Sequence, residues 1–497
     1  MTVSSPVSSA SPTSPTSPTS PTSPASPASP TSPARPAGPA DSVPHLGAPP
    51  RCAVVGSGAA GTMAAYRLRQ VYGPTASITV YEREPVAGGR AHQIDFAGTT
   101  VEVGATVLHS TGLWIKALLE LTGLEPGRGG VQLDGDDEIF GFWNGQRLTL
   151  TTKAAMASLG LGVLRSYGIK SALRVTLATR KLARAWHRIY RLQLDGEVFD
   201  STGQLLDRLG LRHYQERSLA QALREEGARD DFVAEVLAGI TRNMYTQGSG
   251  LNALAGEVGL AGAGLAGGSL YALAEGNQTL FAKALAKLGV DLRLGTAVDR
   301  VEAGSGAVRL TTAGGAEEVF DAVVLATPLE LSDIALTVDG RPAPYAARDY
   351  QSVHVTLVAG QPSRDYFGLP PESGLPSMVF VADTPEARFC SLGVTGFSPL
   401  HQCRIYKFFT VDQPLDDQEV RRVFDQVAEI GRFHWRGAYP VLRPAVEPPP
   451  FKLAQGLYYV NGFESAASTL ELDAVAAYNT AGLVARDFPA PAGPAVS

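Results

Sequence analysis

CAVVGSGAAGTMAAYRLRQVYGPTASITVYEREPVAGGR, residues 52–90, is the stretch that decides the fold. Its apolar start, residues 52–55, predicts a buried parallel strand, and a glycine-rich turn then leads into a helix predicted over 62–71. A strand, a glycine turn and a helix in this order place a diphosphate at the positive end of the helix. A second predicted strand, 77–81, ends at Glu82, whose carboxylate suits the hydroxyls of an adenosine ribose. The stretch therefore predicts a dinucleotide-binding α/β fold.

The glycines of the first turn have separate tasks in such a fold. Gly56 permits the tight turn, Gly58 leaves no Cβ between the backbone and the diphosphate, and Gly61 allows the helix to pack closely on the strand. An ordinary flexible loop has the same spacing, but the strand, the helix and the acid around this one favour a binding site. The residues predicted to bind the dinucleotide here are Gly56, Gly58, Ala59, Ala60, Gly61, Glu82 and Arg83.

A second glycine pair, Gly88-Gly89-Arg90, follows shortly after Glu82. It resembles the second glycine pair and arginine of the flavin amine oxidase superfamily. The resemblance implies FAD rather than NAD, with the turn following the diphosphate and ribityl chain and the Arg90 guanidinium bonding phosphate oxygens. The alternative is a surface hairpin turn.

Length and composition set broad limits. A chain of 497 residues exceeds what one core usually supports, so two domains are expected. The net charge of −6 gives no general attraction to nucleic acid, and the excess of Arg over Lys with abundant Ala and Gly favours a GC-rich, bacterial genome. Cys52, Cys390 and Cys403 have neither metal-ligand spacing nor a disulfide pattern, as expected for a cytoplasmic protein without a metal.

Residues 1–50 differ from the rest of the chain. Ser-Pro-Thr and Ser-Pro-Ala triplets repeat through 11–33, a composition that cannot bury enough apolar surface to fold. We predict a disordered tail, which is either a plain spacer or an arm that docks a partner. No secretory signal is visible at its start, so a cytoplasmic location is expected.

Residues 101–109 predict a strand that brings small residues to a place where the backbone approaches a flat ligand. Ala105 and Val107 are therefore predicted to contact the cofactor. His109 follows directly, and it is either a polar group near the flavin and the mouth of the substrate site or a satisfied buried histidine.

Basic residues accumulate between 139 and 194, where the chain has no Asp or Glu. Arg180, Arg184, Arg188 and Arg191 share one side of a predicted helix, with apolar residues on the other. This basic amphipathic helix, placed at 165–191, either contacts an anionic membrane surface or is a solvated helix face. The protein is thus expected to be cytoplasmic, with possible membrane association.

Two further regions supply site candidates. Residues 242–247, with Tyr245 and Gln247, join two apolar stretches and either line a pocket or pack helix against helix. The apolar run 251–274 carries Glu257 and many glycines, so it is not expected to span a membrane. In the alternating strands of 331–450 stand His354 and Lys407. Amine oxidases have a lysine near flavin N5 on a comparable strand. By this comparison His354 is a candidate for a position near flavin N5.

The pattern of the first domain returns after residue 270. A helix over 280–288 and strands over 291–294, 308–312 and 320–325 are predicted, and Val298 is placed to pair with adenine through its backbone. The strand 457–460 leads to Glu464, predicted to hold a ribityl hydroxyl, and to a helix starting near Leu470, whose N-terminus would stabilise negative charge on the flavin.

The predicted fold class is α/β, an FAD-binding Rossmann-like domain of the glutathione reductase or amine oxidase type with an inserted mixed α+β substrate domain. The FAD-binding domain is predicted over 51–142, 270–330 and 451–488, and the substrate domain over 143–269 and 331–450.

Several phrases between residues 52 and 486 resemble the prenylcysteine oxidase (prenylcysteine lyase) family. They are VGSGAAG, YEREPVAGGR, EVGATVLH, RIYR, NMYTQ, EGN, VLATPL and, most distinctively, LYYVNGFESAASTLELDAVAAYN. The resemblance implies FAD as cofactor, and it adds weight to His109, Tyr245 and Gln247 as catalytic candidates and to Glu471 as a site residue.

Members of that family are FAD-dependent thioether oxidases, so the resemblance implies a small lipophilic thioether and molecular oxygen as substrates. Flavin N5 takes hydride from the isoprenoid carbon next to sulfur, water adds, and the adduct collapses to free cysteine and an aldehyde, while oxygen yields hydrogen peroxide. Two alternatives stay open from the residues. One is an amine oxidase or desaturase of another lipophilic substrate, and the other is a flavin-binding scaffold without turnover.

Overall fold

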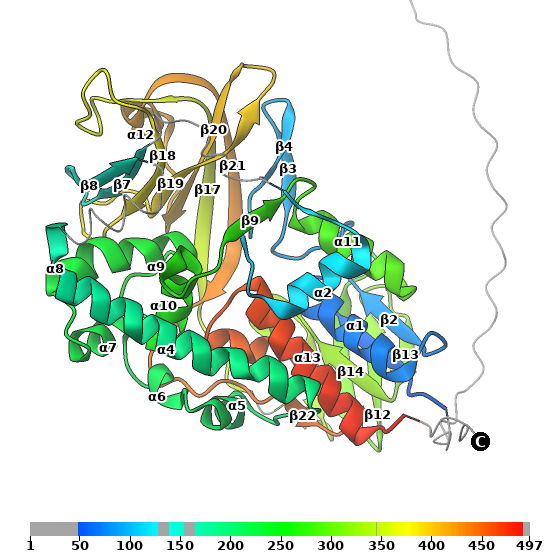
Figure 1. Cartoon of the computed structure of the whole chain (residues 1–497). Helices are drawn as coiled ribbons and strands as arrows, with labels where there is room; N and C mark the ends of the chain where they lie inside the picture. Colours follow the sequence, from blue (N-terminus) through cyan, green and yellow to red (C-terminus); the bar gives the residue numbers. More distant parts are fainter. Residues whose placement is uncertain (1–47, 128–138, 154–164, 344, 491–497) are drawn as a thin grey trace, which may run out of the picture. The chain divides into compact units, whose positions relative to one another are not determined.

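The computed structural model describes residues 48–127, 139–153, 165–343 and 345–490, which belong to one compact unit. Of the tail predicted over 1–50, only residues 48–50 lie within these ranges. Three larger sheets, two small ones and a group of helices make up this unit (Figure 1).

A six-stranded sheet carries the first glycine turn, in the order β10-β2-β1-β14-β23-β22. Its strands are β1 (Cys52–Val55), β2 (Ile78–Tyr81), β10 (Asp291–Arg293), β14 (Ala322–Leu325), β22 (Lys452–Ala454) and β23 (Leu457–Tyr459). Neighbouring strands are parallel, except that β22 and β23 are antiparallel. Every residue of β1, β2, β14 and β23 is buried, because both faces of the sheet are covered.

Helices cover one face of this sheet, and a second sheet covers the other. Cys52 and Val54 pack among the helices, whereas Ala53 and Val55 pack on the second sheet, as the two-residue period of a strand requires. The helices are α1 (Ala59–Tyr72), α2 (Leu113–Thr122), α11 (Asn277–Leu288) and α13 (Leu470–Asp487). The second sheet has the order β13-β12-β11-β15-β16, with β11 (Val298–Gly304), β12 (Ala307–Thr312), β13 (Glu317–Phe320), β15 (Ala335–Val338) and β16 (Arg341–Pro342).

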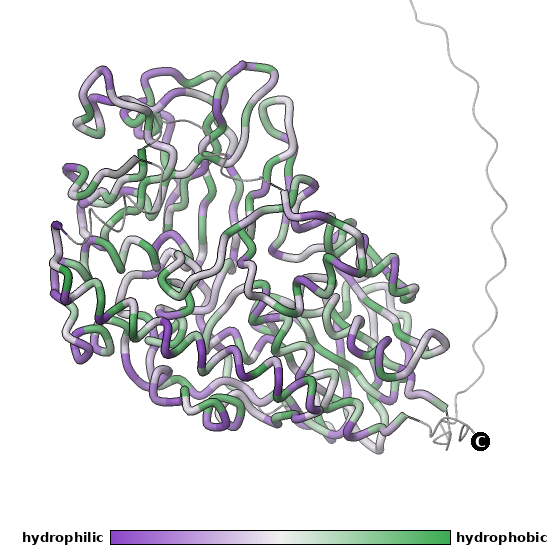
Figure 2. Tube along the Cα trace, in the orientation of Figure 1, coloured by the Kyte–Doolittle hydropathy of each residue, from purple (hydrophilic) through white to green (hydrophobic). Residues whose placement is uncertain are grey.

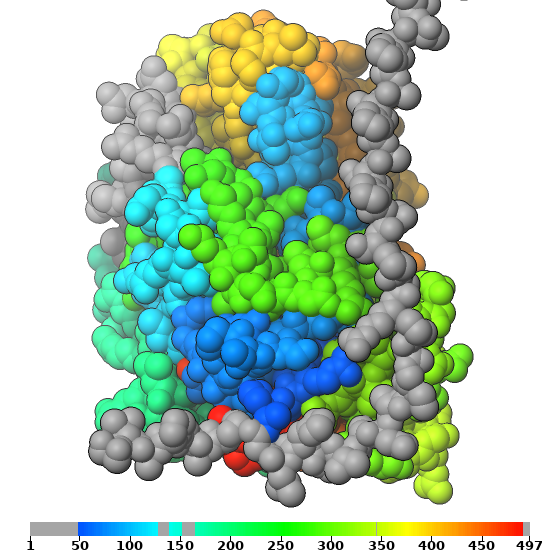
Figure 3. Space-filling view, turned by 90° about the vertical axis from the view of Figure 1, so that its right-hand side faces the viewer, coloured from blue at the N-terminus to red at the C-terminus, as the bar shows by residue number. Residues whose placement is uncertain are grey.

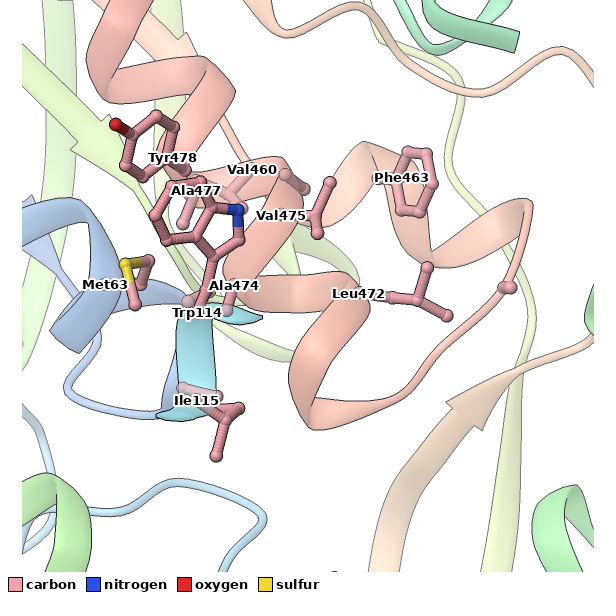
Figure 4. Close-up of a cluster of buried hydrophobic side chains, with 14 of the residues drawn as sticks. Met63, Trp114, Ile115, Val460, Phe463, Leu472, Ala474, Val475, Ala477 and Tyr478 are labelled. Atoms are coloured by element: carbon pink, nitrogen blue, oxygen red, sulfur yellow. The ribbon is translucent and has the colours of Figure 1, made fainter. Parts of the chain in front are cut away.

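The core around α13 joins the two ends of the chain (Figure 4). The Trp114 ring of α2 stacks on the Tyr478 ring of α13 with 3.8 Å between centroids, and Met63 of α1 lies beside them. The Trp114 indole N–H donates to Gln193 Oε1 of the long helix α4 (Ile169–Leu194) at 2.7 Å. The C-terminal helix is thereby held by three helices from earlier in the chain.

A seven-stranded mixed sheet forms a separate layer, in the order β21-β17-β20-β19-β18-β7-β8. Its strands are β7 (Ile139–Trp143), β8 (Leu148–Lys153), β17 (Tyr350–Pro362), β18 (Pro376–Val381), β19 (Ser391–Ser398), β20 (Cys403–Val411) and β21 (Phe424–Pro440). The hairpin β3 (Gln93–Phe96) and β4 (Thr99–Glu102) projects beside this sheet, where the Ser398 hydroxyl donates to the Ala97 carbonyl at 2.7 Å (Figure 3).

The remaining helices follow α4, along which hydrophilic and hydrophobic residues alternate (Figure 2). They are α5 (Thr202–Leu209), α6 (Arg212–Gln215), α7 (Leu219–Glu225), α8 (Asp230–Phe232), α9 (Ala238–Tyr245), α10 (Ala253–Leu260) and α12 (Asp417–Val423), with π-helical turns η1 (Val233–Leu237) and η2 (Ala261–Leu265) and 3-10 turns η3 (Leu329–Leu331) and η4 (Asn461–Ser465). A small sheet joins β5 (Leu108–His109), β6 (Pro126–Gly127) and β9 (Leu270–Leu273). Of the helices described, none is both long and apolar enough to cross a membrane.

The structure differs from the sequence predictions at several boundaries. The first helix begins at Ala59 rather than at residue 62, the basic helix occupies Ile169–Leu194, and the strand predicted over 320–325 is two strands, β13 and β14. The domain boundary predicted at residue 142 falls inside β7, which pairs with β18. Residues 335–338 form β15, which pairs with β11, although we assigned them to the substrate domain. Alternation of apolar residues identifies a strand but not its partner.

Candidate functional site

The first glycine turn leaves an opening at the N-terminus of α1. A Cβ on Gly56, whose φ is 106°, would lie 2.6 Å from the Ala326 carbonyl oxygen, and one on Gly61 would lie 1.8 Å from the Gly56 carbonyl oxygen. A Cβ on Gly58 would meet nothing nearer than the Gly88 oxygen at 3.6 Å among the described residues. Gly56 and Gly61 are thus required by the protein's own packing, whereas at Gly58 the protein leaves space.

The start of α1 is suited to an anion. The first N–H groups of a helix have no intrahelical partner, Gly58 at the N-cap has no side chain to accept them, and the first turn carries no acid. Ala59 and Ala60 occupy this first turn. The turn therefore presents uncapped donors and the positive end of the helix dipole.

Glu82 stands at the end of β2 against the same turn. Its Oε2 accepts from the Ser57 N–H at 3.0 Å and from the Ser57 hydroxyl at 2.6 Å, and its backbone carbonyl accepts from the Thr296 N–H at 2.7 Å. The latter contact brings Val298, at the start of β11, into the same region. Arg83 points elsewhere, because its guanidinium donates to the Leu331 carbonyl at 3.0 Å and pairs with Glu84.

The second glycine pair packs on the first turn. A Cβ on Gly89, whose φ is 57°, would lie 3.2 Å from the Gly58 Cα, and Gly88 has a φ of 131°. Both positions therefore require glycine.

Arg90 binds two acids rather than pointing away from the protein. Its guanidinium donates to both carboxylate oxygens of Glu464 and, at 3.0 Å, to the Ala438 carbonyl, and it lies 3.8 Å from Asp473. Burial opposes ionisation of Glu464, but Arg90 holds the pKa of Glu464 below its usual value. Burial, with the nearby Glu464 carboxylate, raises the pKa of Asp473 well above its usual value, so the two acids beside Arg90 differ in their tendency to ionise.

Two adjoining cavities lie between this group and the seven-stranded sheet. The smaller, of about 70 Å³, is lined by Arg90, Asp473 and Trp435, and the larger, of about 420 Å³, extends towards α4 and η2. The residues that line both are Gly104, Ala105, Asn243, Phe409, Tyr439, Ser468, Thr469 and Leu470. The predicted residues Ala105 and Leu470 thus lie at the junction of the cavities.

Apolar side chains dominate the larger cavity. Helix α4 contributes Leu182, Trp186 and Tyr190, and the seven-stranded sheet contributes Met378 and Phe380. The π-helical turn η2 contributes only small residues, Ala261, Gly262 and Ala263, which leave the cavity wide at that wall. A π-helical turn in a cavity wall is a common feature of functional sites.

His109 and Val107 lie at the larger cavity, at its partly exposed side. The His109 Nδ1 lies 2.8 Å from the Thr111 hydroxyl, and burial lowers the pKa of His109. A Cβ on Gly268 would lie 2.4 Å from the His109 ring, so the glycine makes room for the histidine. Val107 lines the larger cavity and is 48% exposed, and its contact with the cofactor stays a prediction.

Tyr245 and Gln247 are not among the described residues that line the two cavities, so their predicted catalytic role gains no support from the geometry. Tyr245 is fully buried against Tyr439, and Gln247 donates to the Pro440 carbonyl and accepts from the Leu442 N–H. From the same segment Asn243 and Met244 line the larger cavity. Thr246, with a φ of 55°, ends α9 and turns the chain away.

Glu471 of α13 forms hydrogen bonds with α2 and α4 beside the cavity. Its carboxylate accepts from the Trp114 and Ile115 N–H groups at the start of α2, both at 2.9 Å, and from the Tyr190 hydroxyl of α4 at 2.9 Å. Burial raises the pKa of Glu471. It therefore caps α2 and shapes the wall rather than facing a ligand.

Lys407 of β20 lines the larger cavity, whereas His354 does not. The Lys407 Nζ donates to the Glu102 carbonyl at 3.1 Å and to the Thr106 hydroxyl at 3.0 Å. The His354 ring stacks on the His434 ring with 4.3 Å between centroids, on the face of β17 opposite the cavity-lining Val353. The placement of His354 near the site is therefore wrong.

The family model described as prenylcysteine lyase matches residues 156–492, more than half of the chain. The chain belongs to the prenylcysteine lyase family. A second model, described as an NAD(P)-binding Rossmann-like domain, matches residues 54–120, which contain both glycine turns.

Curated members of the prenylcysteine lyase family align along almost the whole chain. Farnesylcysteine lyase of Arabidopsis thaliana is 30% identical over 461 residues, covering 89% of this chain and 89% of its own. Prenylcysteine oxidase 1-like of Bos taurus is 30% identical and covers 87% of this chain and 90% of its own, and prenylcysteine oxidase 1 of Bos taurus is 27% identical. These relatives are eukaryotic, so a bacterial origin stays a prediction from composition.

Solved structures confirm the predicted fold class. A redesigned putrescine oxidase superposes with a TM-score of 0.60 at 17% identity, and cyclohexylamine oxidase from Brevibacterium oxydans with a TM-score of 0.59 at 15% identity. Each alignment covers 88% of this chain and 99% of the other. This family member thus has the amine oxidase arrangement of a Rossmann-like domain with a second sheet.

The prenylcysteine lyase family member is an FAD-dependent oxidoreductase, and its residues fit that cofactor. Gly58 leaves room for a diphosphate, the N-terminus of α1 offers uncapped donors, and Glu82 is an acid beside them. The sequence interpretation missed Asp473 and the network around Arg90. An acid among Leu472, Ala474 and Val475 in a buried helix was a usable signal, because a buried carboxyl needs a partner.

Proposed function

We propose that the protein is an FAD-dependent oxidase that cleaves the thioether of a prenylcysteine-type substrate, with oxygen as acceptor. The products are a free thiol, an aldehyde and hydrogen peroxide. The observation that carries the proposal is the large apolar cavity that adjoins the Arg90 and Asp473 group at the end of the dinucleotide-binding sheet.

When FAD is bound, it serves as the oxidant and accepts two electrons from the carbon next to sulfur. The chain's residues bind and orient the substrate around it. Met244, Met378 and Phe380 offer a flexible apolar surface to an isoprenoid chain, and sulfur-containing side chains adapt well to branched ligands.

Acid–base groups at the cavity are few, which agrees with a reaction of this class. Lys407, His109, His187 and Glu471 line the larger cavity, and Glu471 is engaged in capping α2. The main task of the residues is therefore positioning.

The test is anaerobic addition of farnesylcysteine to the purified holoenzyme, followed by readmission of air. Bleaching of the flavin absorbance and release of one hydrogen peroxide per aldehyde are expected. A panel of lipophilic amines is run in parallel. Oxidation of amines without oxidation of thioethers would overturn the proposal in favour of an amine oxidase, and no oxidation of either would leave a flavin-binding protein.

A second proposal concerns the outer face of α4, for which we infer contact with an anionic membrane surface. Ile169, Leu173 and Leu177 are 54–66% exposed, and the exposed cations Lys170 and Arg174 stand among them. Such a mixture of aliphatic and basic side chains suits the headgroup region of a bilayer.

The position of α4 supports this proposal. The opposite face of the same helix lines the larger cavity through Leu182 and Trp186, and Val107 and Leu270 are exposed at the edge of that cavity. A lipophilic substrate would thus pass from the membrane into the cavity beside the helix. We propose that this takes place on the cytoplasmic side of a membrane.

A further inference from the structure

Lys407 is a partly buried cation in the wall of an apolar cavity. It is the one Lys or Arg among the described residues that line the larger cavity. Its side chain extends from β20, and the Nζ lies 5.2 Å from the centroid of the Phe409 ring, a residue shared by both cavities. The cation therefore stands close to the junction of the cavities.

The hydrogen bonds of Lys407 leave one donor unused. An ammonium group has three N–H donors, and Nζ gives two of them to the Glu102 carbonyl and the Thr106 hydroxyl. Both acceptors are neutral oxygens. Within the described ranges Lys407 forms no ion pair, because the Glu102 carboxylate accepts from the Asn277 N–H at 2.7 Å instead.

The charges around Lys407 do not neutralise it at close range. Burial raises the pKa of Glu102 and lowers that of Lys407, because the cavity wall disfavours the charged form of each group. The other titratable residues described at the cavity are His109, His187, Tyr190, Tyr439 and Glu471. Burial lowers the pKa of both histidines and raises the pKa of Glu471 and of both tyrosines. A buried ammonium without a counter-ion is unfavourable, and an anionic ligand would offset this cost.

We infer that Lys407 binds the α-carboxylate of the substrate, so that the preferred substrate is a prenylated cysteine with a free carboxylate rather than its ester. This inference rests on the proposed function and specifies its substrate. The cysteine end lies at Lys407 and Phe409, and the isoprenoid chain extends towards Met244, Met378 and Phe380. The sulfur, which joins the two, lies between them at the junction.

The test is a binding measurement that needs no turnover. S-dodecylcysteine has a saturated chain without allylic activation, and S-dodecylcysteamine is the same molecule without the carboxylate. Isothermal titration calorimetry of the holoenzyme is expected to show about tenfold or more tighter binding of the acid, the usual effect of a hydrogen bond between charged groups. Lys407→Met is expected to remove this preference by weakening the acid and leaving the amine unchanged.

Two further variants distinguish the possible causes. Lys407→Arg keeps a cation and should retain part of the preference, and Lys181→Met removes an exposed lysine of α4 and should retain all of it. Equal binding of the two compounds by the parent overturns the inference. An equal loss of both compounds in Lys407→Met overturns it as well, since that result indicates a purely structural lysine.

Turnover separates this inference from the proposed function. Farnesylcysteine and its methyl ester are compared as substrates, and a KM at least about tenfold lower for the acid is expected. Oxidation of both at equal KM refutes the inference and keeps the function. Carboxylate-dependent binding without oxidation of any thioether keeps the role of Lys407 as an anion-binding residue and refutes the function.

Discussion

Arg90 and Glu464 are 374 residues apart in the sequence, and their side chains bind each other beneath the cavity. Both were predicted to bind FAD, one through phosphate and the other through the ribityl chain. The structure instead shows them as a pair, with the Tyr350 hydroxyl and the Asn461 amide also donating to Glu464. The pair thus links the first segment of the dinucleotide-binding fold to its last segment.

Arg90→Gln is expected to destabilise the protein by about 3 kcal/mol, because it leaves the buried Glu464 carboxylate without its cation. Flavin content should fall in parallel. Chemical denaturation measures the first effect and the ratio of flavin to protein absorbance the second. Arg309→Gln breaks an exposed pair with Glu317 and should cost less than about 1 kcal/mol. Equal effects of the two variants would contradict the importance of the buried pair.

Gly58→Ala is expected to keep the fold and lose FAD. The nearest described protein atom, the Gly88 oxygen, would lie 3.6 Å from the added Cβ, so the protein tolerates it. A loss of flavin would therefore come from a clash between the Cβ and the cofactor. Absorbance of the purified variant and its far-UV circular dichroism are the measurements. Gly250→Ala, where a Cβ meets nothing within 4 Å, is the control. A Gly58→Ala protein with normal flavin content would show that the diphosphate lies elsewhere.

Glu257 gives the protein a pH-dependent stability. It is buried in α10, its Oε2 has no partner within the described residues, and burial raises its pKa to about 7, with Glu226 adding to this and Thr179 and Arg217 opposing it. Because the folded state holds this proton more tightly than the unfolded state, stability is full below about pH 4.5 and declines as pH rises towards 7.

Glu257→Gln should remove that decline and stabilise the protein above pH 7 by about 1–3 kcal/mol. Thermal unfolding at pH 5 and pH 8 compares the variant with the parent. A parent whose unfolding temperature changes no more than that of Glu257→Gln across this interval would refute the role of Glu257.

Replacing the exposed leucines of α4 should weaken membrane binding. Leu173→Ser with Leu177→Ser removes the apolar contact, and Arg174→Gln with Arg184→Gln removes the attraction to anionic lipid. Sedimentation with vesicles that contain anionic phospholipid is the measurement. Added salt should also weaken binding, because it screens the attraction between the arginines and the anionic lipid. Arg341→Gln on β16 is the control. If the parent protein does not bind such vesicles, the proposed membrane contact is wrong and the outer face of α4 is simply solvated.

The sequence predicted the dinucleotide-binding half of the fold well because each signal there is local. Strand β1 occupies the predicted residues, and Gly56, Gly58 and Glu82 meet at the start of α1, since a glycine turn between a strand and a helix has few possible geometries. Alternation within 331–450 predicted strands there, but not that β7 and β8 join the same sheet, because strand order depends on contacts between distant segments.

Which residues of a segment line the cavity is not visible in the sequence. Along β17 the side chains alternate between faces, and nothing local says that Val353 rather than His354 faces the cavity. At the end of α9, Met244 faces the cavity and Tyr245 the core, a difference of one helical position. His109 lines the larger cavity, because its strand follows directly from the Gly104 and Ala105 segment, and its catalytic role stays a prediction.

The strand order of the six-stranded sheet has a consequence for how the protein is made. Helix α1 is among the first elements to leave the ribosome, yet it packs on α13, and β14 pairs with β23, both near the end of the chain. Since synthesis proceeds from the N-terminus, α1 cannot pack on α13 until almost the whole chain has been translated. The nascent protein therefore depends on protection of these early apolar residues, and a chain that stops before residue 470 lacks the helix that completes its core.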